Sequence, residues 1–202
     1  MNLSQEEITE FAQALNNKSE SPRKSTREKQ VRSYDFIHPD KLSRVHLKVL
    51  RSLFSSLERT WASTLSTTFK TDATVTLTSV EQVTFSAYAE SLPERTSIIG
   101  IKLGSLPGFG LMNVPSILAL ATVDRMTGGI GKAPKDTRDL TQIENQVFKR
   151  LIDKLTVDIS SAWRSVKELN ANTTRFYVSI EETEIRRDEM FLIVGFNWNT
   201  LS

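Results

Sequence analysis

The residues that could carry out chemistry are few in this chain, and their spacing matches no common catalytic or metal site. The two histidines, His38 and His46, lie eight positions apart, which is not a zinc-ligand pattern. There are no cysteines, so disulfides, thiolate ligands and thiol catalysis are excluded. Gly108 and Gly110 lack the third glycine of a dinucleotide fingerprint at position 113. We therefore expect no catalytic set, no metal and no cofactor.

The pair Gly131 and Lys132 invites comparison with a phosphate-binding loop. A Walker A motif needs glycine five residues before Gly-Lys, and Ser or Thr directly after it, because that hydroxyl binds magnesium. Met126 and Ala133 occupy those two positions. The segment before the loop also has the pattern of a helix rather than a strand. The sequence therefore argues against nucleotide binding.

The loop 128–131, with the sequence Gly-Gly-Ile-Gly, is the most informative candidate site. Three glycines in four positions permit positive φ angles and a close approach of backbone. The loop lies between two segments with helical patterning, 115–126 and 140–155. We interpret it as a surface that a partner protein contacts, with Ile130 as an apolar side chain for a pocket on that partner. The alternative is a plain helix C-cap followed by a surface loop.

Size and composition indicate one globular domain and a tail. The chain has 202 residues, of which 39% are hydrophobic and 25% are charged, and its net charge is +2. So small a net charge gives no reason to invoke nucleic acid. The longest apolar stretch, near 190–196, is far shorter than the roughly 20 residues that span a bilayer. We therefore expect no nucleic-acid partner and no direct membrane insertion.

Residues 1–15 predict a short amphipathic helix. Ser4 is a candidate N-cap, and Glu7 stands three residues later as in a capping box. A helix of about three turns is marginal alone in water, so we expect it to fold when its apolar side meets a groove on a partner. A frayed terminus is the alternative. The apolar positions at helical spacing are Ile8, Phe11, Ala12 and Leu15.

Residues 16–33 predict a disordered linker, because they are polar and carry almost no apolar side chains. Between Lys18 and Arg32 there are six basic and two acidic side chains, a net charge of +4. A basic arm for nucleic acid is the alternative, but the segment has no aromatic side chain to stack on bases. A tether that raises the local concentration of whatever the helix binds is simpler.

Residues 34–202 predict an α/β domain in which long helices pack on a β-sheet. The first long helix begins at Pro39-Asp40, and the second runs over 140–169. Trp61 and Trp163 are expected in the core. The apolar stripe of the second helix is Ile143, Val147, Leu151, Leu155 and Ile159. Strands are predicted at 74–78, 96–103, 108–114, 175–185 and 190–198, with a further helix at 115–127.

The two halves of this domain have the same order of elements. Each runs through a long helix, a tryptophan near its end and a strand hairpin, and the second hairpin would turn at 186–189. This weak repeat suggests a pseudo-twofold domain with helices on a sheet.

Four blocks of sequence, in this order, resemble the FliM family of flagellar motor switch proteins. The first is similar to the short peptide with which the family captures phosphorylated CheY. The second and third look like the entry into the family's middle domain and the block that follows it. The resemblance covers nearly the whole chain. The blocks are LSQEEI at 3–8, YDF and PDKLS within 34–43, SVEQVTF at 79–85 with SLP at 91–93, and DRMTGGIG at 124–131 with RDLTQIE at 138–144.

The resemblance implies a CheC-like α/β domain and a set of partners. FliG would dock on the loop, and middle domains would pack side by side into a ring, for which Arg51 and Glu58 are our candidates. FliN would bind a C-terminal domain beyond Ser202. The protein would lie in the cytoplasm, at the inner membrane, in the flagellar basal body. The implied FliG-binding residues are Gly128, Gly129, Ile130 and Gly131, and the CheY-binding residues are Leu3, Ser4, Gln5, Glu6, Glu7, Ile8 and Phe11.

The resemblance also brings an enzymatic alternative. CheC-type phosphatases share the expected fold and remove phosphate from CheY with a Glu and an Asn spaced E-x-x-N on the long helices. Arg150 and Asp153 occupy those positions on the second helix, and Glu58 and Trp61 on the first. Because both helices lack the amide that orients the attacking water, we expect a scaffold that sets the direction of flagellar rotation, not an enzyme.

Overall fold

The computed structural model describes residues 5–6, 8–9, 12–13, 42–104 and 109–200. The six described residues before position 14 are helical. Within that segment, Thr9 donates its hydroxyl to the carbonyl oxygen of Gln5 at 2.7 Å. The predicted linker at 16–33 and the start of the first long helix at Pro39-Asp40 lie outside the described residues.

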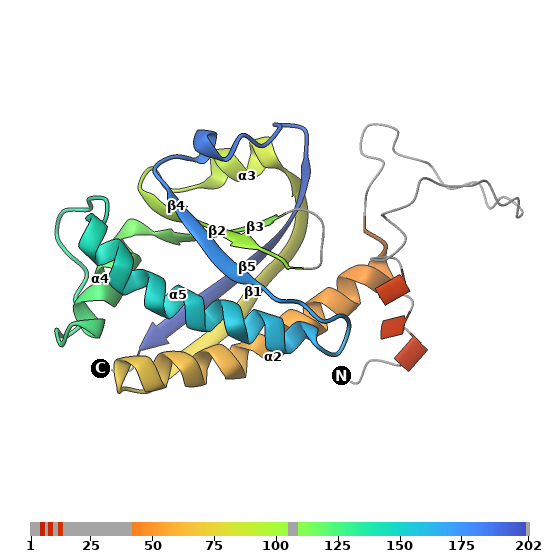
Figure 1. Ribbon diagram of the computed structural model, residues 1–202, viewed down its shortest axis with the longest axis horizontal. Helices are drawn as coiled ribbons and strands as arrows, with labels where there is room; N and C mark the ends of the chain where they lie inside the picture. The colour runs from red at the N-terminus through yellow and green to blue at the C-terminus, as the bar shows by residue number, and fades with distance from the viewer. Residues whose placement is uncertain (1–4, 7, 10–11, 14–41, 105–108, 201–202) are drawn as a thin grey trace, which may run out of the picture.

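Two long helices, α2 (Arg44–Phe69) and α5 (Gln142–Trp163), pack against each other beneath the strands in Figure 1. Helix α2 begins after Ser43, whose side chain accepts the N–H of His46. Helix α5 begins at a capping box, as described below, and ends at Trp163 rather than at 169 as the sequence predicted. No helix among the described residues is both long and apolar enough to cross a bilayer.

The strands form two antiparallel sheets. Strand β1 (Ala73–Thr84) pairs with β5 (Met190–Thr200), and the register shifts between Leu77 and Ser79. Strand β2 (Thr96–Lys102) lies between β3 (Phe109–Pro115) and β4 (Asn172–Tyr177). The predicted hairpin of 96–103 with 108–114 is therefore confirmed, whereas the short strand predicted at 74–78 is longer than expected.

The second predicted hairpin, over 175–198, is wrong. Strand β4 ends at Tyr177, a 3-10 helix η1 (Ile180–Thr183) follows, and β5 pairs with β1 in the other sheet. Directly after the strand, the N–H of Val178 is bound by the Glu182 side chain and not by a neighbouring strand, and Glu184, which ends η1, adopts a left-handed conformation with φ 56°. Alternating residues identify a strand, but they do not say which distant strand it joins.

Two shorter helices complete the fold. Helix α3 (Phe85–Ser91) was not predicted, and it begins after Thr84, whose side chain accepts the N–H of Ala87. Helix α4 (Ser116–Met126) follows β3 and confirms the helix predicted at 115–127. Helix α4 contacts both α5 and α2, and the glycine loop follows its C-terminal end (Figure 1).

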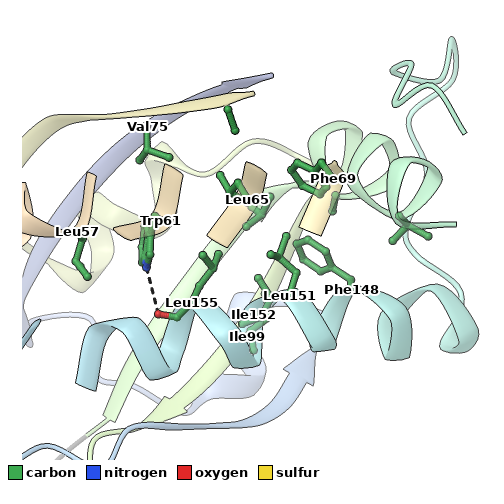
Figure 2. Close-up of a cluster of buried hydrophobic side chains, with 14 residues drawn as sticks. Leu57, Trp61, Leu65, Phe69, Val75, Ile99, Phe148, Leu151, Ile152 and Leu155 are labelled. Atoms are coloured by element: carbon green, nitrogen blue, oxygen red, sulfur yellow. Dashed lines mark hydrogen bonds between the residues drawn. The ribbon is translucent and has the colours of Figure 1, made fainter. Parts of the chain in front are cut away.

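The core lies between the long helices and the strands, and Figure 2 shows its centre. Trp61 is 6% exposed and its ring centroid lies 4.5 Å from that of Phe196. Trp163 is also buried and packs edge-on against Phe54 at 6.3 Å. The prediction that both tryptophans belong to the core is confirmed.

One residue of the predicted stripe on α5 is not in the core. Ile143 is 78% exposed, whereas Phe148, Leu151 and Leu155 are fully buried. Ile143 lies five residues before Phe148, which places it about 140° around the helix from that buried side chain. The periodic pattern therefore identified the helix but assigned this position to the wrong face.

Candidate functional site

The glycine loop starts where α4 ends. The N–H of Thr127 points at the carbonyl oxygens of Val123 (3.0 Å) and Asp124 (3.2 Å), and the N–H of Gly128 points at that of Arg125 (3.3 Å). Gly128 has φ 100°, a conformation that favours glycine. The end of the helix is therefore satisfied by the chain itself, as in the C-cap interpretation.

Asp124 holds the loop against the end of α4. Its carboxylate oxygen Oδ2 accepts the N–H of Gly131 at 2.9 Å, and its backbone oxygen accepts the N–H of Gly129 at 2.8 Å. A Cβ atom on Gly129 would fall 2.3 Å from both carboxylate oxygens. A side chain at this position would therefore have to displace the carboxylate of Asp124.

Arg125 makes the second attachment of the loop. Its Nη1 donates to the carbonyl oxygen of Gly129 at 3.4 Å. Gly131 has φ 75°, and a Cβ atom there would lie 3.4 Å from the Cβ of Arg125. The side chains of Asp124 and Arg125 thus lie against the loop and leave its outer surface open. Ile130, between the two glycines, is 77% exposed.

The connection from the loop to α5 ends in a hydrogen-bonded cluster at the first turn of that helix. Thr141 accepts the N–H of Glu144, and Glu144 accepts the N–H of Thr141 at 2.7 Å, which is a complete capping box. Both terminal guanidinium nitrogens of Arg138, Nη1 and Nη2, also donate to Glu144 at 2.7 Å. The Arg138 hydrogen bond, together with those from Thr141, lowers the pKa of the Glu144 carboxyl to about 2.

The two candidates for self-association differ in their surroundings. Arg51 is exposed on α2. Glu58 is half-buried, and its Oε1 accepts the N–H of Leu77 at 2.6 Å, where the ladder between β1 and β5 changes register. The Glu58 carboxylate therefore satisfies a backbone group in β1.

The positions weighed for a phosphatase do not come together as a catalytic pair. Trp61 is buried, and Arg150 is exposed. Asp153 accepts two hydrogen bonds from Lys149, at 2.7 and 2.9 Å, and another from Thr173 on β4. Both carboxylates that could act are thus bound to neighbours in the fold. Among the residues that the structure describes, no three His, Asp or Glu side chains are grouped so as to hold a metal ion.

The candidate CheY-binding residues are only partly described. Gln5 and Glu6 are helical and exposed, and Ile8 is helical and half-buried. The other four, Leu3, Ser4, Glu7 and Phe11, lie outside the described residues.

Sequence reasoning found the loop but missed the residues that shape it. It noted Asp124 and Arg125 only as neighbours of the glycines, and Glu144 only as part of a resemblance. A carboxylate in the last turn of a helix, a few residues before a glycine run, was the available signal, because a negative charge is unfavourable at that end of the helix dipole.

Comparison with known proteins gives a consistent result. The family model described as "Flagellar motor switch protein FliM" matches residues 43–199. FliM of Treponema pallidum (strain Nichols) is 29% identical over 170 residues, which are 83% of this chain and 49% of the relative. FliM of Borreliella burgdorferi (strain B31) is 29% identical over 194 residues, 95% of this chain and 54% of the relative. The chain spans about half the length of these curated relatives.

Solved structures share the fold. A FliG–FliM complex from H. pylori matches with a TM-score of 0.75 and 22% identity, over 78% of this chain and 87% of that chain. The FliM middle domain from H. pylori matches with a TM-score of 0.72 and 21% identity, over 79% and 87%. At these identities the likeness shows the fold alone, and it agrees with the predicted α/β class. The family model covers most of the residues, and on that ground the chain belongs to the family of the flagellar motor switch protein FliM.

Proposed function

We propose that this chain is the signal-receiving and FliG-docking part of a flagellar motor switch scaffold, which sets the direction of rotation. The single observation that carries the proposal is the loop at 128–131, which is hydrogen-bonded to its own helix and leaves Ile130 77% exposed. Binding residues are often carried by loops that a rigid scaffold positions. A relative of the same fold, from H. pylori, was solved in a complex with FliG.

The proposed division of the chain follows from the sequence. Residues 1–15 bind phosphorylated CheY, 16–33 are a tether, and 34–202 are the middle domain. Copies of that domain pack side by side in a ring at the cytoplasmic face of the inner membrane, and FliN binds a further domain. For the ring, the exposed side of α2 that carries Arg51 is the better candidate, because Glu58 is bound to Leu77.

The docking proposal is tested by calorimetric titration of the 202-residue chain with the middle domain of FliG. Ile130→Asp replaces the exposed apolar side chain with a charged one and should abolish binding, since an unpaired charge in an interface is costly. Val178→Asp is the matched control, because Val178 is 87% exposed and lies after β4, outside the loop. Equal binding by the Ile130→Asp and Val178→Asp variants would refute docking at the loop.

Gly129→Trp is a less suitable variant. A side chain at position 129 would displace the Asp124 carboxylate, which lies 2.3 Å from the place of its Cβ. Lost binding could then result from a changed loop rather than from a lost contact, whereas Ile130→Asp leaves the hydrogen bonds of the loop in place.

The CheY proposal has a separate test. Ile8→Ala should weaken binding of phosphorylated CheY and leave binding of FliG unchanged, because the two sites lie on different parts of the chain. Measurable CheY dephosphorylation by this chain, slowed by Glu58→Ala, would instead favour the phosphatase alternative.

A further inference from the structure

The attachment of the glycine loop rests on a matched pair of residues, Asp124 and Gly129. All three of the atoms nearest to a Cβ on Gly129 belong to the Asp124 carboxyl, at 2.3 to 2.4 Å. Unlike Gly128 and Gly131, Gly129 does not have a positive φ. Backbone conformation therefore does not demand glycine at 129, but any larger residue there would have to displace the Asp124 carboxylate.

Asp124 stands where helix electrostatics disfavour it. It lies in the last turn of α4, where the partial negative charge of the helix dipole opposes a carboxylate. Its neighbour Arg125 has the favourable sign for this position. The hydrogen bond that the carboxylate accepts from the N–H of Gly131, at 2.9 Å, offsets this unfavourable interaction with the helix dipole. A hydrogen bond to an ionised acceptor is stronger than one between neutral groups.

Because of these contacts, the loop is held in a single conformation before any partner binds. The hydrogen bonds from Gly129 and Gly131 to Asp124, and the one from Arg125 to Gly129, hold both sides of Ile130. A binding loop that is already ordered loses less conformational entropy when its partner arrives. The same side chain on an unattached glycine loop would bind more weakly, since glycines have the largest backbone freedom to lose.

We propose that Asp124 is a positioning residue, which orders the loop before binding and so increases its affinity for FliG without contacting FliG. This inference rests on the proposed docking function, and it adds that the affinity of Ile130 depends on a carboxylate behind the loop. It also assigns Gly129 the role of making room for that carboxylate.

The test is a double-mutant cycle in the 202-residue chain, with affinity for the FliG middle domain measured by calorimetry. Asp124→Ala and Gly129→Ala should each weaken binding by about tenfold, or about 1.4 kcal/mol. In the Asp124→Ala background, Gly129→Ala should have almost no further effect, because both changes remove the same attachment. Asp124→Asn should retain part of the affinity, since its amide oxygen can still accept the Gly131 N–H. Asp136→Ala, which removes a charge from an exposed position in the connection between the loop and α5, is the control.

Nitrogen relaxation of the free protein gives a second readout that does not depend on FliG. The order parameter of the Gly131 amide should be near that of rigid backbone, roughly 0.85, and should fall below about 0.6 in Asp124→Ala. A Gly131 amide that stays equally ordered in this variant would overturn the inference, as would additive losses in the cycle. Unchanged affinity in a loop that has become mobile would also overturn it.

The two proposals fail in different ways. If the unaltered chain binds FliG, and Ile130→Asp abolishes this but Asp124→Ala does not weaken it, then the docking proposal stands and the positioning role is wrong. If the unaltered chain does not bind FliG at all, the proposed function is wrong and the positioning role falls with it.

Discussion

The indole N–H of Trp61 donates a hydrogen bond to the backbone carbonyl oxygen of Leu155 at 3.2 Å, and this bond joins α2 to α5 inside the core (Figure 2). The two residues lie 94 positions apart, so the contact forms only when the two long helices come together. At the position where the phosphatase pattern would need an asparagine, this chain has a side chain that packs and aligns its helices.

Trp61→Phe should therefore destabilise the domain. Phenylalanine keeps part of the ring packing against Phe196 but loses the hydrogen bond and leaves unfilled volume. We expect the free energy of unfolding to fall by about 2 kcal/mol. Urea unfolding followed by circular dichroism measures this directly. A loss below about 0.5 kcal/mol, typical of surface substitutions, would contradict the structural role of the indole.

The bond from Leu77 to Glu58 makes a second prediction about stability. Glu58→Ala leaves a half-buried backbone N–H without its acceptor at the register shift of β1, which should cost about 1–3 kcal/mol. Glu58→Gln should cost less, because its amide oxygen can still accept the bond. Thermal unfolding of both variants distinguishes them. Equal losses would show that the carbonyl-type acceptor at position 58 is not what matters.

The capping box at the start of α5 predicts a pH dependence. The pKa of Glu144 is about 2 in the folded protein, below its ordinary value of 4.5, chiefly because Arg138 donates to it. A depressed pKa stabilises the folded state above pH 4.5, and this contribution is lost as the pH falls from 4.5 toward 2. Glu144→Gln should thus be less stable than the unaltered protein at pH 7, and the difference should shrink steadily in acid.

Replacing Thr141, the N-cap residue of α5, measures how much the capping box contributes to the free energy of unfolding at neutral pH. Thr141→Ala deletes the side chain that accepts the N–H of Glu144, and it should cost about 1 kcal/mol. Denaturant titrations of both variants from pH 7 to pH 3 separate the two effects. A Glu144→Gln difference that stays constant over this range would contradict the assigned pKa.

Alanine substitutions on the exposed and buried faces of α5 should differ in their effect on stability. Ile143→Ala should change the free energy of unfolding by no more than about 0.5 kcal/mol, because Ile143 is 78% exposed. Leu151→Ala should cost about 2–5 kcal/mol, because Leu151 is fully buried and leaves a cavity. Chemical unfolding measures both. A large loss of stability in Ile143→Ala would show that Ile143 does belong to the buried stripe that the spacing predicted.

Much of this protein could be predicted from local sequence. The 3.6-residue period identified both long helices, alternation identified part of β1, the turn residues at 104–107 identified the pair β2 and β3, and the glycine run identified the loop at 128–131. These features depend on residues within a few positions of each other, and so the sequence alone is enough to predict them. The collinear blocks also pointed to the family that the comparison confirms for residues 43–199.

The tertiary structure decided the remainder. Strand β5 pairs with β1, which precedes it by more than 100 positions, and no local pattern specifies that partner. The spacing placed Ile143 in the apolar stripe, but packing buries the face of α5 that carries Phe148, Leu151 and Leu155. The carboxylates of Asp124 and Glu58 each satisfy a backbone N–H whose position is set by the path of the chain in space. The sequence by itself located the two long helices, the β2–β3 hairpin and the glycine turn, because local patterns specify them. Long-range packing decided where β1 and β4 end, which strand β5 joins, and which groups the elements present to one another.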